Sequence, residues 1–129
     1  MARIKTRESD LHQQVVNYLK YQYPNVLFRT DFAAGIKMSI GQAVKHKALQ
    51  KCRAWPDIFI AQPAGQWYGL FIELKKEGVK LEKKDGTPAT PHISEQVEMM
   101  YSLIDLGYYC EICPGFDHAK AVIDSYMKK

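Results

Sequence analysis

The spacing of apolar residues changes several times along the chain, and each change predicts a different element. Between Thr6 and Tyr23 apolar side chains recur every three or four residues, which is typical of a helix with one buried face. Runs of β-branched and aromatic residues, such as Ile58–Ile60, are typical of strands instead. In order, the pattern predicts a helix (6–23), a strand (26–30), a loop (32–41), a short helix (42–53), two strands (55–60 and 67–75), a long polar loop (76–91), a helix from its cap Ser94 to a stop at Gly107, a strand (108–113) and a helix from its cap Asp117 to Tyr126.

Two of these strands are joined by a short connection that contains the turn residues Pro63–Gln66, and this connection predicts an antiparallel hairpin. With the turn centred on Gly65, residues that face each other across the ladder have numbers that sum to 130, so Asp57 lies opposite Glu73. Side chains alternate between the two faces of a strand, so Lys75 shares the face of Glu73. The hairpin therefore predicts two carboxylates and one ammonium at a single place.

The order of the elements predicts an α/β fold with a mixed central β-sheet flanked by helices. The hairpin strands are apolar on both faces away from their charged ends, so helices must cover both sides of the sheet. The strand at 67–75, the helix after it and the strand at 108–113 form a right-handed crossover, which makes these two strands parallel. With 129 residues the chain has the length of one domain, spanning 1–129.

Charges at the ends of apolar strands are costly unless they are paired or bind a cation. Carboxylates with open positions suit Mg²⁺ or Mn²⁺, which complete their shells with water and with phosphate oxygens of a substrate. Asp57 and Glu73 therefore predict a divalent-metal site for a phosphodiester, with Lys75 adding positive charge. The alternative is an ordinary cross-strand ion pair between Lys75 and either carboxylate, which is common at sheet edges.

Composition narrows the class of protein without deciding it. No apolar run approaches the roughly 20 residues of a membrane span and no signal sequence opens the chain, so we expect a soluble intracellular protein without a membrane partner. The net charge of +4 is only weak support for a polyanionic partner. Three cysteines argue against a disulfide framework, and Cys110 and Cys113 point to opposite faces of one predicted strand, which favours structural thiols over a zinc site.

Three further features each have a structural and a functional interpretation. Glu8 shares the apolar stripe of the first helix, where an acid either stabilises the helix dipole or takes part in the metal site. The helix at 42–53 has a basic side that is either solvated or in contact with phosphates. Loops as long as 76–91 are usually functional or disordered, and this one carries Lys76, Lys80, Lys83 and Lys84.

Together these motifs give the chain a resemblance to a known family. It resembles the PD-(D/E)xK nuclease superfamily, and within it a stand-alone VRR-NUC domain, in Pro56-Asp57, in Glu73-Leu74-Lys75 on the next strand, in the helical Glu8 and in Gln96 near the start of the following helix. The resemblance extends from Glu8 to Tyr126 and depends on the combination of motifs. It implies the restriction-endonuclease-like core of that superfamily, in agreement with the predicted α/β fold.

The resemblance also implies a role for each residue of the motifs. Asp57 and Glu73 would bind the metal, with the backbone carbonyl of Leu74 as a further ligand and Glu8 reaching it directly or through water. Lys75 would orient or activate the attacking water and stabilise charge on the phosphorane. We favour the orienting and electrostatic role, because neighbouring carboxylates favour the protonated form of a lysine.

Other positions surround this set. Gln96 is implied to lie next to the site, in contact with water or with the phosphate of the scissile strand. Related domains commonly have Gly before Pro-Asp, whereas this chain has Trp55, which either packs on a neighbour or stacks on a base. The loop lysines are expected to hold phosphates of the DNA near its branch point.

The implied activity is that of a Mg²⁺- or Mn²⁺-dependent DNA endonuclease acting on branched DNA, such as four-way junctions or flaps, in a bacterial or phage-infected cytoplasm. A homodimer is expected, because paired cuts at a junction need two sites; its interface would draw on Trp55, Trp67, Tyr21 and Tyr23. One alternative is a restriction-like endonuclease, for which the chain has no recognisable reading module. The other is a catalytically silent nucleic-acid-binding domain, which would not need Glu73 and Lys75 together.

Overall fold

The computed structural model describes residues 8–31, 38–51 and 53–129, with side chains described from Asp10 onward within these ranges. Thr6, where the first predicted helix begins, and the loop residues 32–37 lie outside them. The order of the helices and strands is the one that the sequence predicts. The elements are α1 (Glu8–Gln22), β1 (Phe28–Thr30), α2 (Ile40–Ala48), β2 (Ile58–Ile60), β3 (Leu70–Lys75), α3 (Pro91–Asp105), β4 (Tyr109–Pro114) and α4 (Phe116–Met127).

The strands form one mixed sheet in the order β1-β2-β3-β4. β2 and β3 are antiparallel and pair Ile58 with Ile72, which is the predicted register. Gly65 occupies the hairpin turn with a φ of +57°, a left-handed conformation that glycine adopts without strain. β4 runs parallel to β3, as the crossover predicts, and α3 forms the connection between them.

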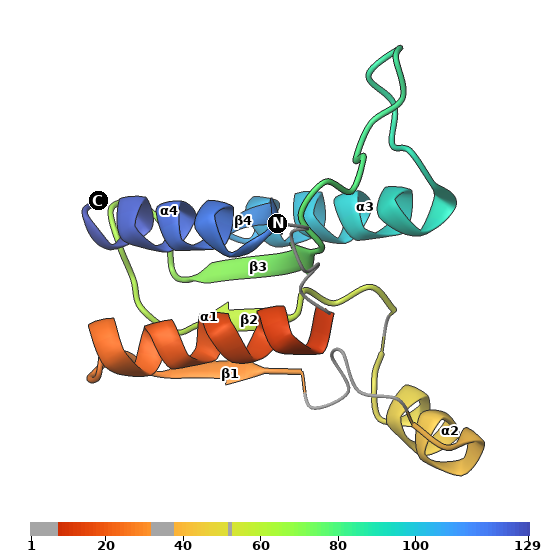
Figure 1. Ribbon diagram of the computed structural model, residues 1–129, viewed down its shortest axis with the longest axis horizontal. Coiled ribbons are helices and arrows are strands. Elements are labelled where there is room, and N and C mark those ends of the chain that lie inside the picture. Colours follow the sequence, from red (N-terminus) through yellow and green to blue (C-terminus); the bar gives the residue numbers. More distant parts are fainter. Residues whose placement is uncertain (1–7, 32–37, 52) are drawn as a thin grey trace, which may run out of the picture.

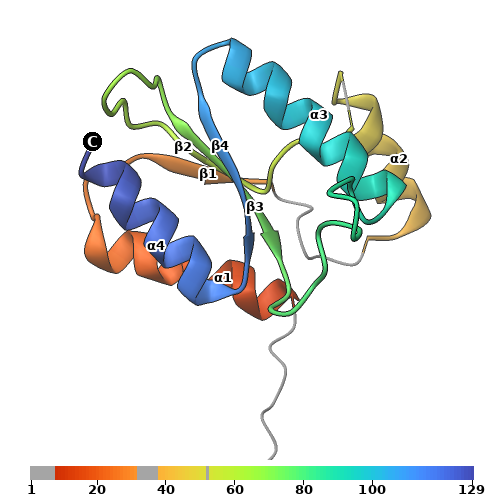
Figure 2. The same ribbon diagram turned by 90° about the horizontal axis from the view of Figure 1, so that it is seen from above.

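Apolar cores lie on both faces of this sheet. α1 and α4 pack against each other and cover one face, while α3 covers the other, as seen from above in Figure 2. The first core joins Ile72 and Leu74 of β3 to the stripes of α1 and α4, and the second joins Phe71 and Cys110 to α3. Successive residues of β3 therefore belong to different cores, which explains its continuous apolar run. Among the described helices, none combines the length and the apolar character needed to cross a membrane.

A polar contact joins α1 to α4 at the edge of the first core. Tyr18 and Tyr23 both donate hydrogen bonds to Oδ1 of Asp124, over 2.5 and 2.7 Å. Lys120 donates to the other oxygen of the same carboxylate over 3.2 Å. Burial opposes ionisation of Asp124, but the hydrogen bonds from the two tyrosines and Lys120 outweigh it and lower the pKa of the carboxyl.

Several helix boundaries differ from the prediction because capping groups act outside the apolar pattern. α2 begins at Ile40 instead of residue 42, since Ser39 and Gln42 form a reciprocal capping box, and it ends at Ala48, well before Arg53. α3 is capped by Thr90, whose hydroxyl accepts from the Ile93 amide, so the predicted cap Ser94 lies inside the helix. At α4 the N-cap position belongs to Gly115, and the predicted cap Asp117 lies in the first turn.

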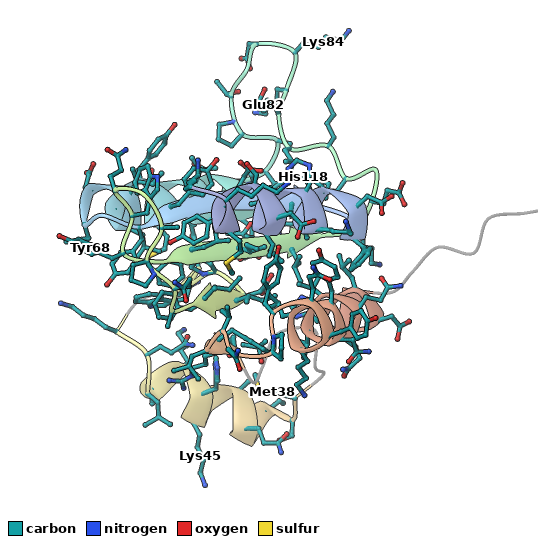
Figure 3. All side chains as sticks on the ribbon, turned by 90° about the vertical axis from the view of Figure 1, so that its left-hand side faces the viewer. Met38, Lys45, Tyr68, Glu82, Lys84 and His118 are labelled. Atoms are coloured by element: carbon teal, nitrogen blue, oxygen red, sulfur yellow. The ribbon has the colours of Figure 1, made fainter. Side chains whose placement is uncertain are left out.

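Two segments project from the end of the molecule where β3 finishes and α1 begins (Figure 1). One is α2, whose apolar residues Ile40, Val44 and Leu49 are exposed. The other is the connection from β3 to α3, which forms a small hairpin with a bridge between Glu82 and Pro88. Figure 3 shows that Lys45 of α2 and Lys84 of this hairpin point away from the body in opposite directions.

Candidate functional site

Asp57 lies at the point where pairing between β2 and β3 ends. The last paired residues are Ile58 and Ile72. Beyond this pair, β3 is contacted by the side chain of Asp57, whose Oδ2 accepts a hydrogen bond of 2.7 Å from the Leu74 amide. On the other side of β3, the Lys75 carbonyl accepts from the Gly115 amide. Because the backbone groups of successive strand residues point in alternate directions, the Leu74 carbonyl faces the side of Asp57.

Glu73 is the buried carboxylate of the site. It projects from β3 toward α3 and is 4% exposed, and its Oε1 accepts a hydrogen bond of 2.7 Å from Nε2 of Gln96, which is equally buried. Lys75 lies on the same face of β3, with Nζ 3.9 Å from Glu73 Oε1. An ionised carboxylate only accepts hydrogen bonds, so Gln96 turns its NH₂ group to Glu73, and its own Oε1 makes no hydrogen bond to any described residue.

His12 is a member of the site that the sequence analysis missed. Its side chain is 9% exposed, and Nε2 lies 3.7 Å from Asp57 Oδ2 without a hydrogen bond to any residue in the described part of the chain. The available signal was position, because His12 follows Glu8 by one helical turn and therefore shares its side of α1. The sequence did not reveal how α1 is rotated relative to β2, which decides whether that side faces Asp57.

These groups fit a hard divalent cation. Two carboxylates, a backbone carbonyl and the buried Oε1 of Gln96 are all oxygen donors, which Mg²⁺ and Mn²⁺ prefer. The Gln96 oxygen is the deciding observation, since a buried acceptor without a protein partner is costly unless a water or ligand satisfies it. Asp57, Glu73 and the Leu74 carbonyl would hold the cation.

Comparison with known proteins supports this architecture. No protein-family model matches the sequence, and no curated protein matches it either. Among solved structures, one described as a VRR_NUC domain protein matches with a TM-score of 0.69 and 24% sequence identity, over 98% of this chain and 92% of that chain. The chain has the fold of a VRR_NUC domain. At this level of identity the match concerns the fold, and it agrees with the resemblance found in the motifs.

On this VRR_NUC fold, the remaining predicted residues have different outcomes. The backbone of Glu8 begins α1, but its side chain lies outside the described residues, so its role stays a prediction. Trp55 is partly exposed and packs its ring against Phe71, with centroids 6.0 Å apart. The loop that follows Lys75 begins at the site end of β3. It carries four exposed lysines, Lys76, Lys80, Lys83 and Lys84.

The two cysteines of β4 belong to opposite cores, as their spacing predicts. Cys110 packs under α3 and Cys113 faces α1 and α4. Burial raises the pKa of the Cys110 thiol to about 12. Burial and, to a smaller degree, the nearby Glu111 carboxylate raise the pKa of the Cys113 thiol further. Both thiols are therefore neutral at physiological pH in the absence of a metal.

Proposed function

We propose that this protein is a Mg²⁺- or Mn²⁺-dependent DNA endonuclease that hydrolyses phosphodiester bonds. The observation that carries the proposal is a group of polar residues at one end of the sheet. Glu73 and Gln96 are buried and hydrogen-bonded to each other, Lys75 lies 3.9 Å from Glu73, and Asp57 accepts a hydrogen bond from the amide of Leu74, the residue after Glu73. A structural ion pair would not need a buried carboxylate, a buried amide and a second carboxylate held by the backbone of the same strand. The VRR_NUC fold supports the same class of activity.

Each residue of the site has a role that its contacts allow. The bound cation would polarise the phosphate and neutralise charge that develops during hydrolysis. The Lys75 ammonium, held near Glu73, adds fixed positive charge for the same purpose and donates hydrogen bonds to a phosphate oxygen or to the attacking water. The Oε1 of Gln96 can accept a hydrogen bond from the attacking water. That bond would orient a lone pair of the water oxygen toward phosphorus.

We infer branched DNA as the preferred substrate and a homodimer as the active form. Exposed lysines follow β3 directly and others lie on α2, so positive charge extends to both sides of the site end (Figure 3). A junction presents phosphates in several directions, which suits charge that is spread in this way. Paired cuts on two strands need two sites, and a two-fold dimer of this chain would supply them.

The decisive experiment uses substitutions that keep the hydrogen bonds and remove the charge. Asp57→Asn retains an acceptor for the Leu74 amide, and Glu73→Gln retains one for Gln96, so both variants should fold. We expect each to lower cleavage about a hundredfold or more on a panel of nicked, flapped, forked and four-way DNAs with Mg²⁺ or Mn²⁺. Matched controls are Asp105→Asn and Glu98→Gln on the exposed side of α3, which should cut normally.

The outcomes separate the candidate functions. Binding of DNA by the wild-type protein without cleavage of any substrate in either metal would favour the silent binding domain and reject the proposal. Cleavage at one sequence in linear duplex, with no preference for branches, would favour the restriction-like alternative. Light scattering with and without a four-way junction tests the dimer, and a monomeric mass in both conditions would reject that part.

A further inference from the structure

A second group of metal-binding side chains lies on the opposite face of the sheet from Glu73. Glu111 and Cys113 of β4 and His118 of α4 each offer one ligand atom, and these three atoms lie within 4.8 Å of one another. Glu111 pairs with Ile72, whose side chain belongs to the core under α1 and α4, while Glu73 projects toward α3. The sheet therefore separates this group from the hydrogen-bonded pair of Glu73 and Gln96.

Local geometry fixes the three side chains in place. Glu111 and Cys113 are two residues apart on one strand and so share a face. Gly115 then turns the chain directly into α4 with a φ of +90°, while its amide donates to the Lys75 carbonyl. This corner brings His118, in the first turn of α4, back over the strand, where Nε2 lies 2.9 Å from Glu111 Oε2. Figure 3 shows His118 on α4 above the sheet.

The surroundings of the group resemble those of a metal site that is closed on one side and open on the other. Cys113 is fully buried, whereas Glu111 and His118 line a cavity of about 350 Å³ that opens to solvent. The hydroxyl of Tyr109 donates to Glu111 Oε1 over 3.1 Å, which leaves Oε2 directed at His118. A carboxylate that is oriented in this way by a neighbouring group is typical of ligands in metal sites.

We propose that Glu111, Cys113 and His118 bind a borderline or soft divalent transition metal, with Zn²⁺ as the best match. Sulfur, nitrogen and oxygen donors from three residues, with the fourth position open to the cavity, suit Zn²⁺ and do not suit Mg²⁺. The charges also balance, because a dication offsets one thiolate and one carboxylate around a neutral imidazole. On binding, the Cys113 thiol releases its proton to solvent and the sulfur takes the metal in its place.

The alternative is a plain ion pair between His118 and Glu111 above a neutral core thiol. The two interpretations differ in one respect that can be measured, namely whether Cys113 sulfur bonds to the cation. Co²⁺ replaces Zn²⁺ in such sites and gives a thiolate-to-metal charge-transfer absorption, which oxygen-only sites cannot produce. The readout is therefore independent of nuclease activity, and it distinguishes failure of this proposal from failure of the proposed function.

The experiment is a Co²⁺ titration of a Cys52→Ser background, which removes the thiol that lies outside the described residues. We expect the absorption band at one Co²⁺ per chain, and we expect added Zn²⁺ to abolish it. Cys110→Ser is the matched control, because it removes a buried thiol three residues away on the opposite face, and it should keep the band. The double variant Asp57→Asn/Glu73→Gln should also keep it, whereas Cys113→Ser should lose it.

Absence of the band from the background protein, or its persistence in Cys113→Ser, would overturn the proposal. If Cys113→Ser fails to fold by circular dichroism, Glu111→Gln and His118→Asn decide instead, since both side chains are partly exposed. Each removes one ligand and should weaken Co²⁺ binding at least about tenfold. Unchanged affinity in both of these variants would likewise reject the site.

Discussion

Asp57 shows how a single side chain can serve both the fold and the site. Its Oδ2 accepts the Leu74 amide, in place of the backbone carbonyl that a longer β2 would provide, and the same oxygen lies 3.7 Å from His12. The carboxylate is therefore held between β3 and α1 in a fixed orientation. Preorganisation of this kind lowers the cost of placing a charged ligand correctly, since little side-chain freedom remains to be lost.

His12 is expected to act as a positioning residue through Asp57. In His12→Ala the carboxylate loses its neighbour on the α1 side, so Mn²⁺ affinity and the cleavage rate should each fall about tenfold. His12→Gln keeps a polar group of similar reach and should recover part of both. Calorimetric titration with Mn²⁺ and single-turnover cleavage measure these effects, with affinity for DNA in the absence of metal expected to stay unchanged.

The control for His12 is Gln13→Ala, an exposed change on the next residue of α1 that removes only a hydrogen bond to Asn17. It should leave the metal affinity and the rate at their wild-type values. A His12→Ala protein that melts lower but binds Mn²⁺ and cuts normally would assign His12 a purely structural role.

At the scale of elements, the contact between α1 and α4 depends on one ionised group. Asp124 accepts from Tyr18 and Tyr23 on or just after α1, and from Lys120 one turn before it on α4. In the Tyr23 side chain, burial and the hydrogen bond to Asp124 raise the pKa to about 12. Over the whole physiological pH range, the hydrogen bond from Tyr23 to Asp124 therefore joins a neutral phenol to an ionised carboxylate. Charge-assisted hydrogen bonds of this kind are stronger than neutral ones.

Asp124→Asn is expected to lower stability by about 1 kcal/mol at neutral pH, because it keeps the shape and removes the charge. The folded-state pKa of Asp124 is lowered, so its contribution is present above the ordinary aspartate pKa of about 4 and disappears as the pH falls through the folded value. Denaturant unfolding of both proteins between pH 7 and pH 3 measures the difference, which should stay constant above about pH 4 and narrow as the pH falls below it. The control Asp105→Asn should show no such dependence, and a gap of the same size at pH 7 and at pH 3 would contradict the assignment.

The elements also show what the sequence could and could not predict. The hairpin register and the contact between Lys75 and Glu73 followed from a short turn and the alternation of strand residues, both of which are local. Gln96 was predicted through the resemblance, and its contact with Glu73 needed the packing of α3 on the sheet. The helix caps at Ser39 and Thr90 have signals in the sequence, Ser-x-x-Gln and Thr-Pro. The prediction followed the apolar pattern instead and placed both helix starts later in the chain. The exposure of α2 could not be predicted from the sequence, because its apolar stripe is typical of a helix that packs on a core.

At the scale of the whole molecule, exposed lysines lie on both segments that project from the site end, and on the hairpin they alternate with Glu82 and Asp85. α2 carries Lys45 and Lys47, and the hairpin between β3 and α3 carries Lys80, Lys83 and Lys84, all exposed. The two segments extend in opposite directions (Figures 1 and 3).

The aromatic residues expected at a dimer interface are partly used elsewhere, since Trp67 and Tyr23 pack against the first core. Tyr21 and Trp55 remain exposed, so the part of the predicted interface that they would form stays a prediction.

Replacing Lys80, Lys83 and Lys84 together by Ala should weaken binding to a four-way junction and flatten its dependence on salt. Each phosphate contact that is lost removes about one unit from the slope of log affinity against log salt. Fluorescence anisotropy at several salt concentrations measures the slope, and Mn²⁺ affinity should stay unchanged. The control removes the same charge elsewhere, with Lys20, Arg29 and Lys128 replaced by Ala. Equal slopes for the two triple variants would exclude a specific role for the hairpin.

The hydrogen bond from Leu74 to Asp57 makes the site observable without a substrate. A backbone amide inside a sheet normally reports on the stability of the strand pairing, but this one donates its hydrogen bond to a carboxylate side chain that is a candidate metal ligand. Its nuclear magnetic resonance signal and its rate of exchange with deuterium therefore follow the state of the Asp57 carboxylate. The end of β3 thus contains a natural sensor, which would register a cation bound at the candidate site in the absence of any DNA substrate.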